Sequence, residues 1–125
     1  MCFSGSGGQG VILASIIFAE AAIISGANAV QSQSYGPEAR GGMCKAETII
    51  SKDKIGFAKS IHPDFLLALT QQAVDRFMGC TSERAIILAD ADLKLEVKPE
   101  ENKNVVFLPI IRTAYELVGR SVTAY

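Results

Sequence analysis

Residues 5–24 read GSGGQG followed by VILASIIFAEAAII, a glycine-rich turn that leads directly into an apolar stretch. Four of the six residues 5–10 are glycines, which permit positive φ angles and let the backbone come close to another group. The apolar stretch predicts a helix from about Gly10 to Ser25, with Gly26 just beyond its end. The turn would then lie at a helix N-terminus, where unpaired N–H groups and the helix dipole favour an anion.

The composition predicts one globular domain. The chain has 125 residues, 49% of them hydrophobic, which is enough for a single core. It has 12 Lys and Arg and 13 Asp and Glu, so its net charge is close to zero. This balance argues against a nucleic-acid-binding surface, and it gives little electrostatic repulsion between copies of the chain. The apolar run is shorter than the roughly 20 residues that span a bilayer, and no cation precedes it. We therefore expect a cytoplasmic protein without membrane or nucleic-acid partners.

The cysteines do not form a recognisable framework. Cys2, Cys44 and Cys80 are odd in number and show no C-x-x-C spacing. This pattern argues against disulfides, iron–sulfur clusters and structural zinc sites. The three thiols are expected to be buried small side chains or inert surface groups in a reducing compartment.

Further along the chain, strand and helix patterns alternate. Strands are expected at Met1–Phe3, Ala29–Ser34, Lys45–Ser51, Phe65–Leu69, Arg84–Ala89 and Asn104–Pro109, and further helices at Gln71–Met78, capped by Thr70, and at Ile111–Val118, closed by Gly119. Within the third strand, alternation places Ala46 and Thr48 on one face and Glu47 on the other. This order predicts an α/β sandwich on a mostly parallel sheet.

The glycine turn permits more than one interpretation. Gly5, Gly7 and Gly10 match G-x-G-x-x-G, but the dinucleotide fingerprint also needs an acidic residue after the next strand, and no carboxylate occurs before Glu38. A P-loop is excluded because no Lys-Ser/Thr pair follows. The glycines either let the helix pack tightly or contact a phosphate-bearing ligand or neighbouring subunit. The candidate contact residues are Gly5, Ser6, Gly7, Gly8, Gln9 and Gly10.

The segment Gln33–Gly42 combines aromatic, charged and glycine residues in one loop, as functional loops often do. The candidate contact residues are Ser34, Tyr35, Gly36, Pro37, Glu38, Arg40 and Gly41. The alternative is a solvated surface loop. His62 is expected at the surface or in a capping role, and Asp90 and Asp92 in a turn, so no catalytic or metal-binding residue is identified.

Together, Gly5–Val11 and Gln33–Gly42 resemble the gamma subunit of 2-oxoacid:ferredoxin oxidoreductases. The order and separation of these segments match, as does the following Lys45-Ala46-Glu47, and Pro63–Leu69 matches more loosely. The sequence of residues 35–42, YGPEARGG, is closer to the 2-oxoglutarate type than to the pyruvate type. The resemblance implies a single Rossmann-like three-layer sandwich over residues 1–125, without the start of its first strand and without its C-terminal part.

The resemblance also implies an enzyme of anaerobic metabolism that is built from several subunits. Such enzymes oxidatively decarboxylate a 2-oxoacid with coenzyme A; from 2-oxoglutarate they give succinyl-CoA, carbon dioxide and reduced ferredoxin. Thiamine diphosphate, Mg²⁺ and [4Fe–4S] clusters carry the chemistry. This chain shows no motif for these cofactors, so they are expected on companion alpha, beta and delta-type subunits.

The isolated chain is then expected to be inactive, and a homodimer is one form that it could take alone. Within the complex, it would scaffold the assembly and shape the access of coenzyme A or substrate. The alternative is a stand-alone module that binds coenzyme A or a nucleotide.

Overall fold

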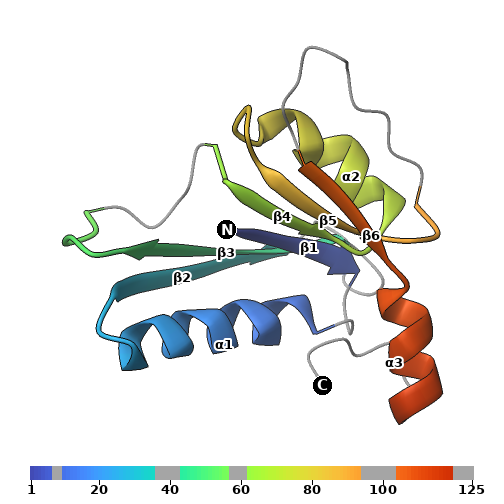
Figure 1. Cartoon of the computed structure of the whole chain (residues 1–125), viewed down its shortest axis with the longest axis horizontal. Coiled ribbons are helices and arrows are strands. Elements are labelled where there is room, and N and C mark those ends of the chain that lie inside the picture. Colours follow the sequence, from blue (N-terminus) through green and yellow to red (C-terminus); the bar gives the residue numbers. More distant parts are fainter. Residues whose placement is uncertain (7–9, 36–42, 57–61, 94–103, 120–125) are drawn as a thin grey trace.

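The computed structural model describes residues 1–6, 10–35, 43–56, 62–93 and 104–119. Within these ranges, one six-stranded sheet carries helices on both faces (Figure 1). The strands are β1 (Cys2–Ser6), β2 (Asn28–Tyr35), β3 (Met43–Ser51), β4 (Phe65–Ala68), β5 (Ile86–Asp90) and β6 (Asn104–Leu108), and the helices are α1 (Val11–Ile24), α2 (Gln71–Phe77), the 3-10 turn η1 (Met78–Cys80) and α3 (Ile110–Val118). The predicted α/β sandwich is confirmed.

The strand order in the sheet is β2-β3-β1-β4-β5-β6. Strands β1, β4, β5 and β6 are parallel, whereas β3 runs antiparallel to both of its neighbours, β1 and β2. The sheet is therefore mostly parallel, as predicted, with one exception. Only residues 36–42 separate β2 from β3, which suits an antiparallel pair because a parallel pair needs a crossover of a dozen or more residues.

Strand β1 is longer than the sequence predicted. Met1–Phe3 was expected to be the strand and Gly5 and Ser6 to belong to the turn, but β1 continues through Ser6. Ser4, Gly5 and Ser6 have weak strand propensity, yet they pair with Lys45, Cys44 and Met43 of β3, and β4 pairs with β1 on the other side. Pairing with β3, and at Ser4 also with β4, overrides the local preference for a turn.

Each face of the sheet has its own core. Because side chains alternate along a strand, Cys2 and Leu66 point to one face while Phe3 and Leu67 point to the other. The α1 side buries Phe3, Val11, Cys44, Ala46, Leu67 and Leu69, and the α2 side buries Cys2, Leu66, Ala68, Ala73, Val74 and Ile87. The sheet is thus the middle of three layers.

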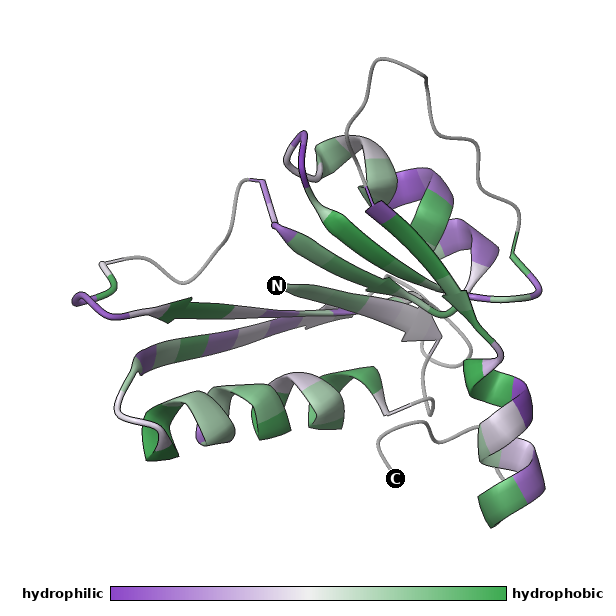
Figure 2. Cartoon of the chain, in the orientation of Figure 1, coloured by the Kyte–Doolittle hydropathy of each residue, from purple (hydrophilic) through white to green (hydrophobic). Residues whose placement is uncertain are grey.

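The two helices that cover these faces differ in character. Figure 2 shows α1 as apolar or weakly polar over nearly its whole length, whereas hydrophilic and hydrophobic residues alternate along α2. The α2 N-terminus is capped as predicted, since the Thr70 hydroxyl accepts a hydrogen bond from the Ala73 N–H at 3.2 Å. None of the described helices is both long and apolar enough to cross a membrane.

Candidate functional site

The two sequence motifs leave the sheet at the same edge. Ser6, the last residue of β1, pairs with Met43, the first residue of β3. Tyr35, the last residue of β2, pairs with Cys44. The glycine turn after Ser6 and the loop after Tyr35 therefore start beside each other, although almost thirty residues separate them in sequence. We call this the motif edge of the sheet.

Some of the predicted contact residues lie on the described side of this edge. Gly5 and Ser6 are in β1, Ser34 and the backbone of Tyr35 are in β2, and Gly10 precedes α1. Gly10 has a φ of 84°, a left-handed conformation that favours glycine, so a positive-φ turn before α1 is confirmed at this position. The other candidates, Gly7, Gly8, Gln9, Gly36, Pro37, Glu38, Arg40 and Gly41, lie outside the described residues.

The motif edge is also a topological switch point. After β1 the chain continues into α1 on one face, and after the adjacent parallel strand β4 it continues into α2 on the other face. The two strand ends stay close, because the Leu69 N–H donates to the Ser4 carbonyl at 3.0 Å. In open α/β sheets, ligands bind in the crevice outside the carboxyl ends of two such strands.

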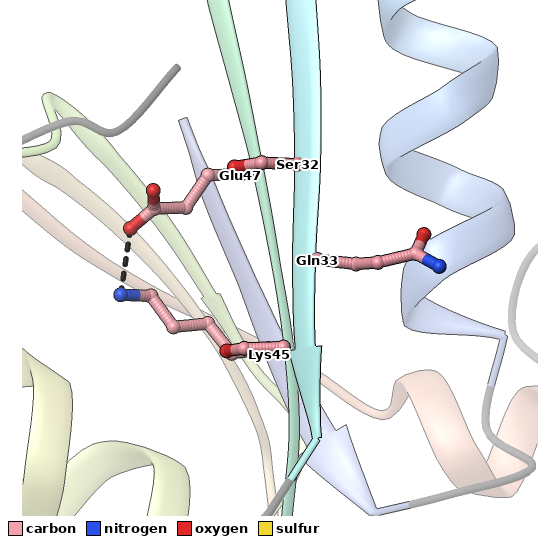
Figure 3. Close-up of a pocket in the computed structure, with 5 residues that line it drawn as sticks. Ser32, Gln33, Lys45 and Glu47 are labelled. Carbon is pink, nitrogen blue, oxygen red and sulfur yellow. Dashed lines mark ion pairs between the residues drawn. The ribbon is translucent and has the colours of Figure 1, made fainter. Parts of the chain in front are cut away.

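A polar hollow of about 140 Å³ opens between β2 and β3 near this edge (Figure 3). Ser32, Ser34, Lys45 and Glu47 line it together with Gln33, whose side chain points to the other face, toward α1. The strand register explains the grouping, since Ser32 pairs with Glu47 and Ser34 pairs with Lys45. The hollow lies on the α2 side of the sheet, because Lys45 and Glu47 pair with Ser4 and Cys2, and Cys2 belongs to the α2-side core.

An ion pair dominates the electrostatics of the hollow. The Lys45 ammonium lies 2.6 Å from a carboxylate oxygen of Glu47, whose side chain is only 8% exposed. The ammonium also lies 5.0 Å from the ring centroid of Phe77 at the end of α2, where a cation–π attraction helps to hold it. Lys45 is the only cation among the lining residues, and Glu47 neutralises it. The hollow thus suits a hydrogen-bonding, uncharged group better than a phosphate.

The sequence motifs included Gln33 and Ser34 but did not single out Lys45 and Glu47 as site residues. These two residues carry opposite charges and lie two apart on one face of a strand. That spacing could have predicted an ion pair between them on a partly buried face. That indication was incomplete, because the other wall of the hollow comes from β2 and the aromatic contact comes from α2.

The remaining polar candidates have structural roles. The buried Asp90 carboxylate accepts hydrogen bonds from the Ile111 N–H at 2.9 Å and the Asp92 N–H at 3.1 Å, which fixes the start of α3 and the turn after β5. Asp92 forms an exposed ion pair with Arg112. The exposed His62 ring lies 3.3 Å from the Cys80 carbonyl. The turn and capping interpretations are confirmed.

The three thiols do not converge. Cys2 is buried on the α2 side, Cys44 is buried on the α1 side and Cys80 is exposed, and all three are free. Burial raises the pKa of the Cys2 thiol to about 11 and also raises the pKa of Cys44. In the part of the chain that the structure describes, no group of three His, Cys, Asp or Glu residues is placed to hold a metal ion.

The sheet order also argues against a dinucleotide site. The fingerprint requires a second strand that lies next to the first and ends in a carboxylate. Here β3 lies between β1 and β2, and β2 contains no acidic residue. The weak match of Gly5, Gly7 and Gly10 to that motif therefore has no matching structural context.

These features define an α/β protein whose two sequence motifs leave the carboxyl edge of its sheet, at a switch point between two parallel strands. Residues 1–124 match the model of the pyruvate ferredoxin/flavodoxin oxidoreductase family. The chain belongs to this family, which confirms the resemblance carried by the two sequence motifs.

The relatives agree with this assignment. The chain is 43% identical over 123 residues to the 2-oxoglutarate synthase subunit KorC of Methanocaldococcus jannaschii. The alignment covers 97% of this chain and 66% of that protein. It is 48% identical, with a TM-score of 0.77, to the solved gamma subunit of keto/oxoacid ferredoxin oxidoreductase from Geobacter sulfurreducens, covering 98% of this chain and 68% of that one. The chain thus spans about two thirds of the length of these two relatives.

A more distant solved structure shows the same fold. It is the 2-oxoglutarate:ferredoxin oxidoreductase from Magnetococcus marinus, with 2-oxoglutarate, coenzyme A and succinyl-CoA bound. Its TM-score is 0.80 at 20% identity, over 92% of this chain and 20% of that one. The chain therefore corresponds in fold to a small part of a much larger polypeptide.

Proposed function

We propose that the chain serves as the gamma subunit of a 2-oxoglutarate:ferredoxin oxidoreductase, which converts 2-oxoglutarate and coenzyme A to succinyl-CoA and carbon dioxide while reducing ferredoxin. The observation that carries this proposal is the 43% identity to a 2-oxoglutarate synthase subunit across 97% of the chain. The sequence of residues 35–42 supports the same substrate, 2-oxoglutarate.

The proposal assigns the redox and decarboxylation chemistry to companion subunits. An iron–sulfur cluster needs several converging thiolates, and Cys2, Cys44 and Cys80 lie on two sheet faces and at the surface. Nor do the described carboxylates converge on a site for the Mg²⁺ that accompanies thiamine diphosphate. Neither cofactor fits the described donor set, so alpha, beta and delta-type companions hold them.

For this chain we propose a role at the motif edge. The glycine turn of residues 5–10 and the loop of residues 34–41 together meet coenzyme A or a companion subunit at the switch point. The hollow at Lys45 and Glu47 adjoins Ser34 and suits the uncharged, amide-bearing arm of coenzyme A, because its one cation is already neutralised. The phosphates would then lie toward the turn or on the companion.

Reconstitution tests the proposed function. The companion subunits of the same organism are assayed with and without this chain for ferredoxin reduction that depends on coenzyme A, using 2-oxoglutarate, pyruvate and ketoisovalerate as substrates. We expect activity only in the complete complex, with 2-oxoglutarate preferred. Turnover by the isolated chain would contradict the subunit role, and a preference for pyruvate would contradict the substrate type.

Calorimetry of the isolated chain distinguishes the alternative of a stand-alone binding module. We expect weak binding of coenzyme A and none of NAD, because the site is completed by companions. Tight binding of coenzyme A to the chain alone would favour the alternative module.

Substitution in the loop tests the motif edge. Arg40→Ala is expected to lower kcat/KM for coenzyme A in the complex about tenfold or more, because a guanidinium can grip a carboxylate or phosphate in two places. Arg84→Ala removes an exposed arginine elsewhere on the chain and is the matched control. Equal kinetics for the two variants would return the loop to an ordinary surface segment.

A further inference from the structure

Helix α1 is held to the sheet in a fixed rotation. Its inward residues Val11, Ser15 and Ala19 are buried. The Thr48 hydroxyl donates to the Ser15 carbonyl at 2.9 Å, and the Gln31 amide donates to the Ser15 hydroxyl at 3.0 Å. These two hydrogen bonds fix which side of the helix faces the sheet, so the opposite side cannot turn inward.

That opposite side is a largely apolar stripe. Its members share a spacing of three or four residues and are exposed: Leu13, Ile17, Glu20, Ala21 and Ile24, which we call the outer stripe. Leu13, Ile17 and Ile24 are 48%, 46% and 86% exposed. Three- and four-residue spacing forms the ridges by which one helix packs on another. A helix that is apolar all round is normally buried on all sides.

Glu20 shows what kind of surface fits there. It is the only charged residue of α1 and lies within the outer stripe. Among the described residues, it has no hydrogen-bond or ion-pair partner. A purely apolar surface placed over the stripe would bury an unpaired carboxylate at a high cost in free energy. A fitting surface therefore carries a cation at this point.

The same stripe on a second copy of the chain does not supply that cation. The stripe runs from Leu13 to Ile24, and Glu20 lies only about 2 Å along the axis from its midpoint, at 1.5 Å rise per residue. A two-fold axis through the midpoint would bring two Glu20 side chains within about 5 Å of each other along the helices. Like charges so close and shielded from water oppose pairing.

We propose that the outer stripe of α1 is a docking surface for a companion subunit, which packs an apolar ridge along it and places a lysine or arginine opposite Glu20. This inference rests on the proposed function as a subunit. It adds to that function the surface that is used and the chemistry of the surface that meets it.

Binding measurements test the proposal. The chain is titrated onto the immobilised companion subunits of the same organism. Glu20→Lys and Ile17→Asp are each expected to weaken binding at least about tenfold, because each leaves an uncompensated charge in the interface. Glu20→Gln, which keeps the shape and loses the charge, is expected to weaken it less. Leu117→Asp on α3, where Leu117 is 79% exposed, is the matched control and should bind like the wild type.

The outcomes separate the two proposals. If the wild-type chain does not join the companions, both the subunit role and the docking surface are wrong. If the wild type and the α1 variants bind equally, only the docking surface is wrong. A wild-type chain that dimerises alone and becomes monomeric as Ile17→Asp would instead assign the stripe to a second copy. Circular dichroism and melting of each variant confirm that the fold is intact.

Discussion

Helices α1 and α2 cover opposite faces of one sheet, but only α2 has an outer side suited to water. In α2, Ala73 and Val74 are buried, and the exposed positions Gln71, Gln72 and Asp75 are polar. In α1, the exposed positions are apolar apart from Glu20. Both helices cover the apolar face of the sheet against which they pack. The difference shows that the apolar residues of α1 exceed what this fold buries, and that excess is available to a surface outside the described fold.

The largest expected effect comes from placing the same charge on the inner and outer sides of these helices. Ala73→Asp is expected to lower the free energy of unfolding by about 3 kcal/mol or more, because it buries an unpaired carboxylate in the α2-side core. Ile17→Asp is expected to lower it by about 1 kcal/mol or less, since Ile17 is half exposed and only helix propensity and repulsion from Glu20 change. Urea unfolding followed by circular dichroism measures both.

Gln72→Asp, an exposed position beside Ala73, controls for the introduction of aspartate into α2. If Ile17→Asp destabilised the isolated chain as much as Ala73→Asp, the outer side of α1 would already be buried within the chain. The comparison between the two helices would then fail.

The next effect concerns the thiol buried on each side. Burial raises the pKa of Cys2 on the α2 side to about 11, from a usual value near 9. Between these two pH values the folded chain keeps a proton that the unfolded chain releases, so stability falls as pH rises. The loss amounts to roughly 2–3 kcal/mol across that range. Below about pH 9 the stabilisation is fully present.

Unfolding free energies from pH 8 to 11 measure this slope. Cys2→Ala is expected to flatten it, and Cys44→Ala on the α1 side is expected to act in the same direction, because burial also raises the pKa of Cys44. Cys80→Ala removes an exposed thiol and controls for the substitution itself. The wild-type slope persisting in Cys2→Ala would show that another group is responsible.

Much of the fold follows from local sequence. Continuous apolar runs predicted β4 and β5, and capping chemistry predicted the start of α2 at Thr70. Positive φ at Gly26 and Gly119 marks the ends of α1 and α3 where glycine was expected. In each case, the deciding interaction lies within a few residues of the chain.

The remainder depends on pairing between distant segments. Gly5 and Ser6 were predicted to lie in a turn, and only their pairing with β3 makes them strand residues. Alternation placed Glu47 on the face away from Ala46, but the register of β2 and the position of Phe77 decide that this face holds a hollow. The proximity of the two sequence motifs likewise arises from the place of β3 between β1 and β2. No local pattern encodes these neighbours.

The smallest expected effect tests whether each helix is held by its own threonine. Thr48→Val removes the buried hydrogen bond to the Ser15 carbonyl and is expected to cost about 1 kcal/mol, since that carbonyl keeps its helical partner. Thr70→Ala removes the α2 cap at a similar cost, about 1 kcal/mol. Thr70→Ser retains the hydroxyl and should retain most of the stability.

If the two variants lose the same free energy of unfolding, native-state hydrogen exchange still distinguishes them. Thr48→Val is expected to speed exchange mainly in α1, because it loosens the polar anchor of that helix, and Thr70→Ala mainly in the first turn of α2. Both variants speeding exchange in both helices to the same extent would mean that the two sides open as one unit. The difference between α1 and α2 would then be confined to their outer surfaces and would not extend to how the sheet holds them.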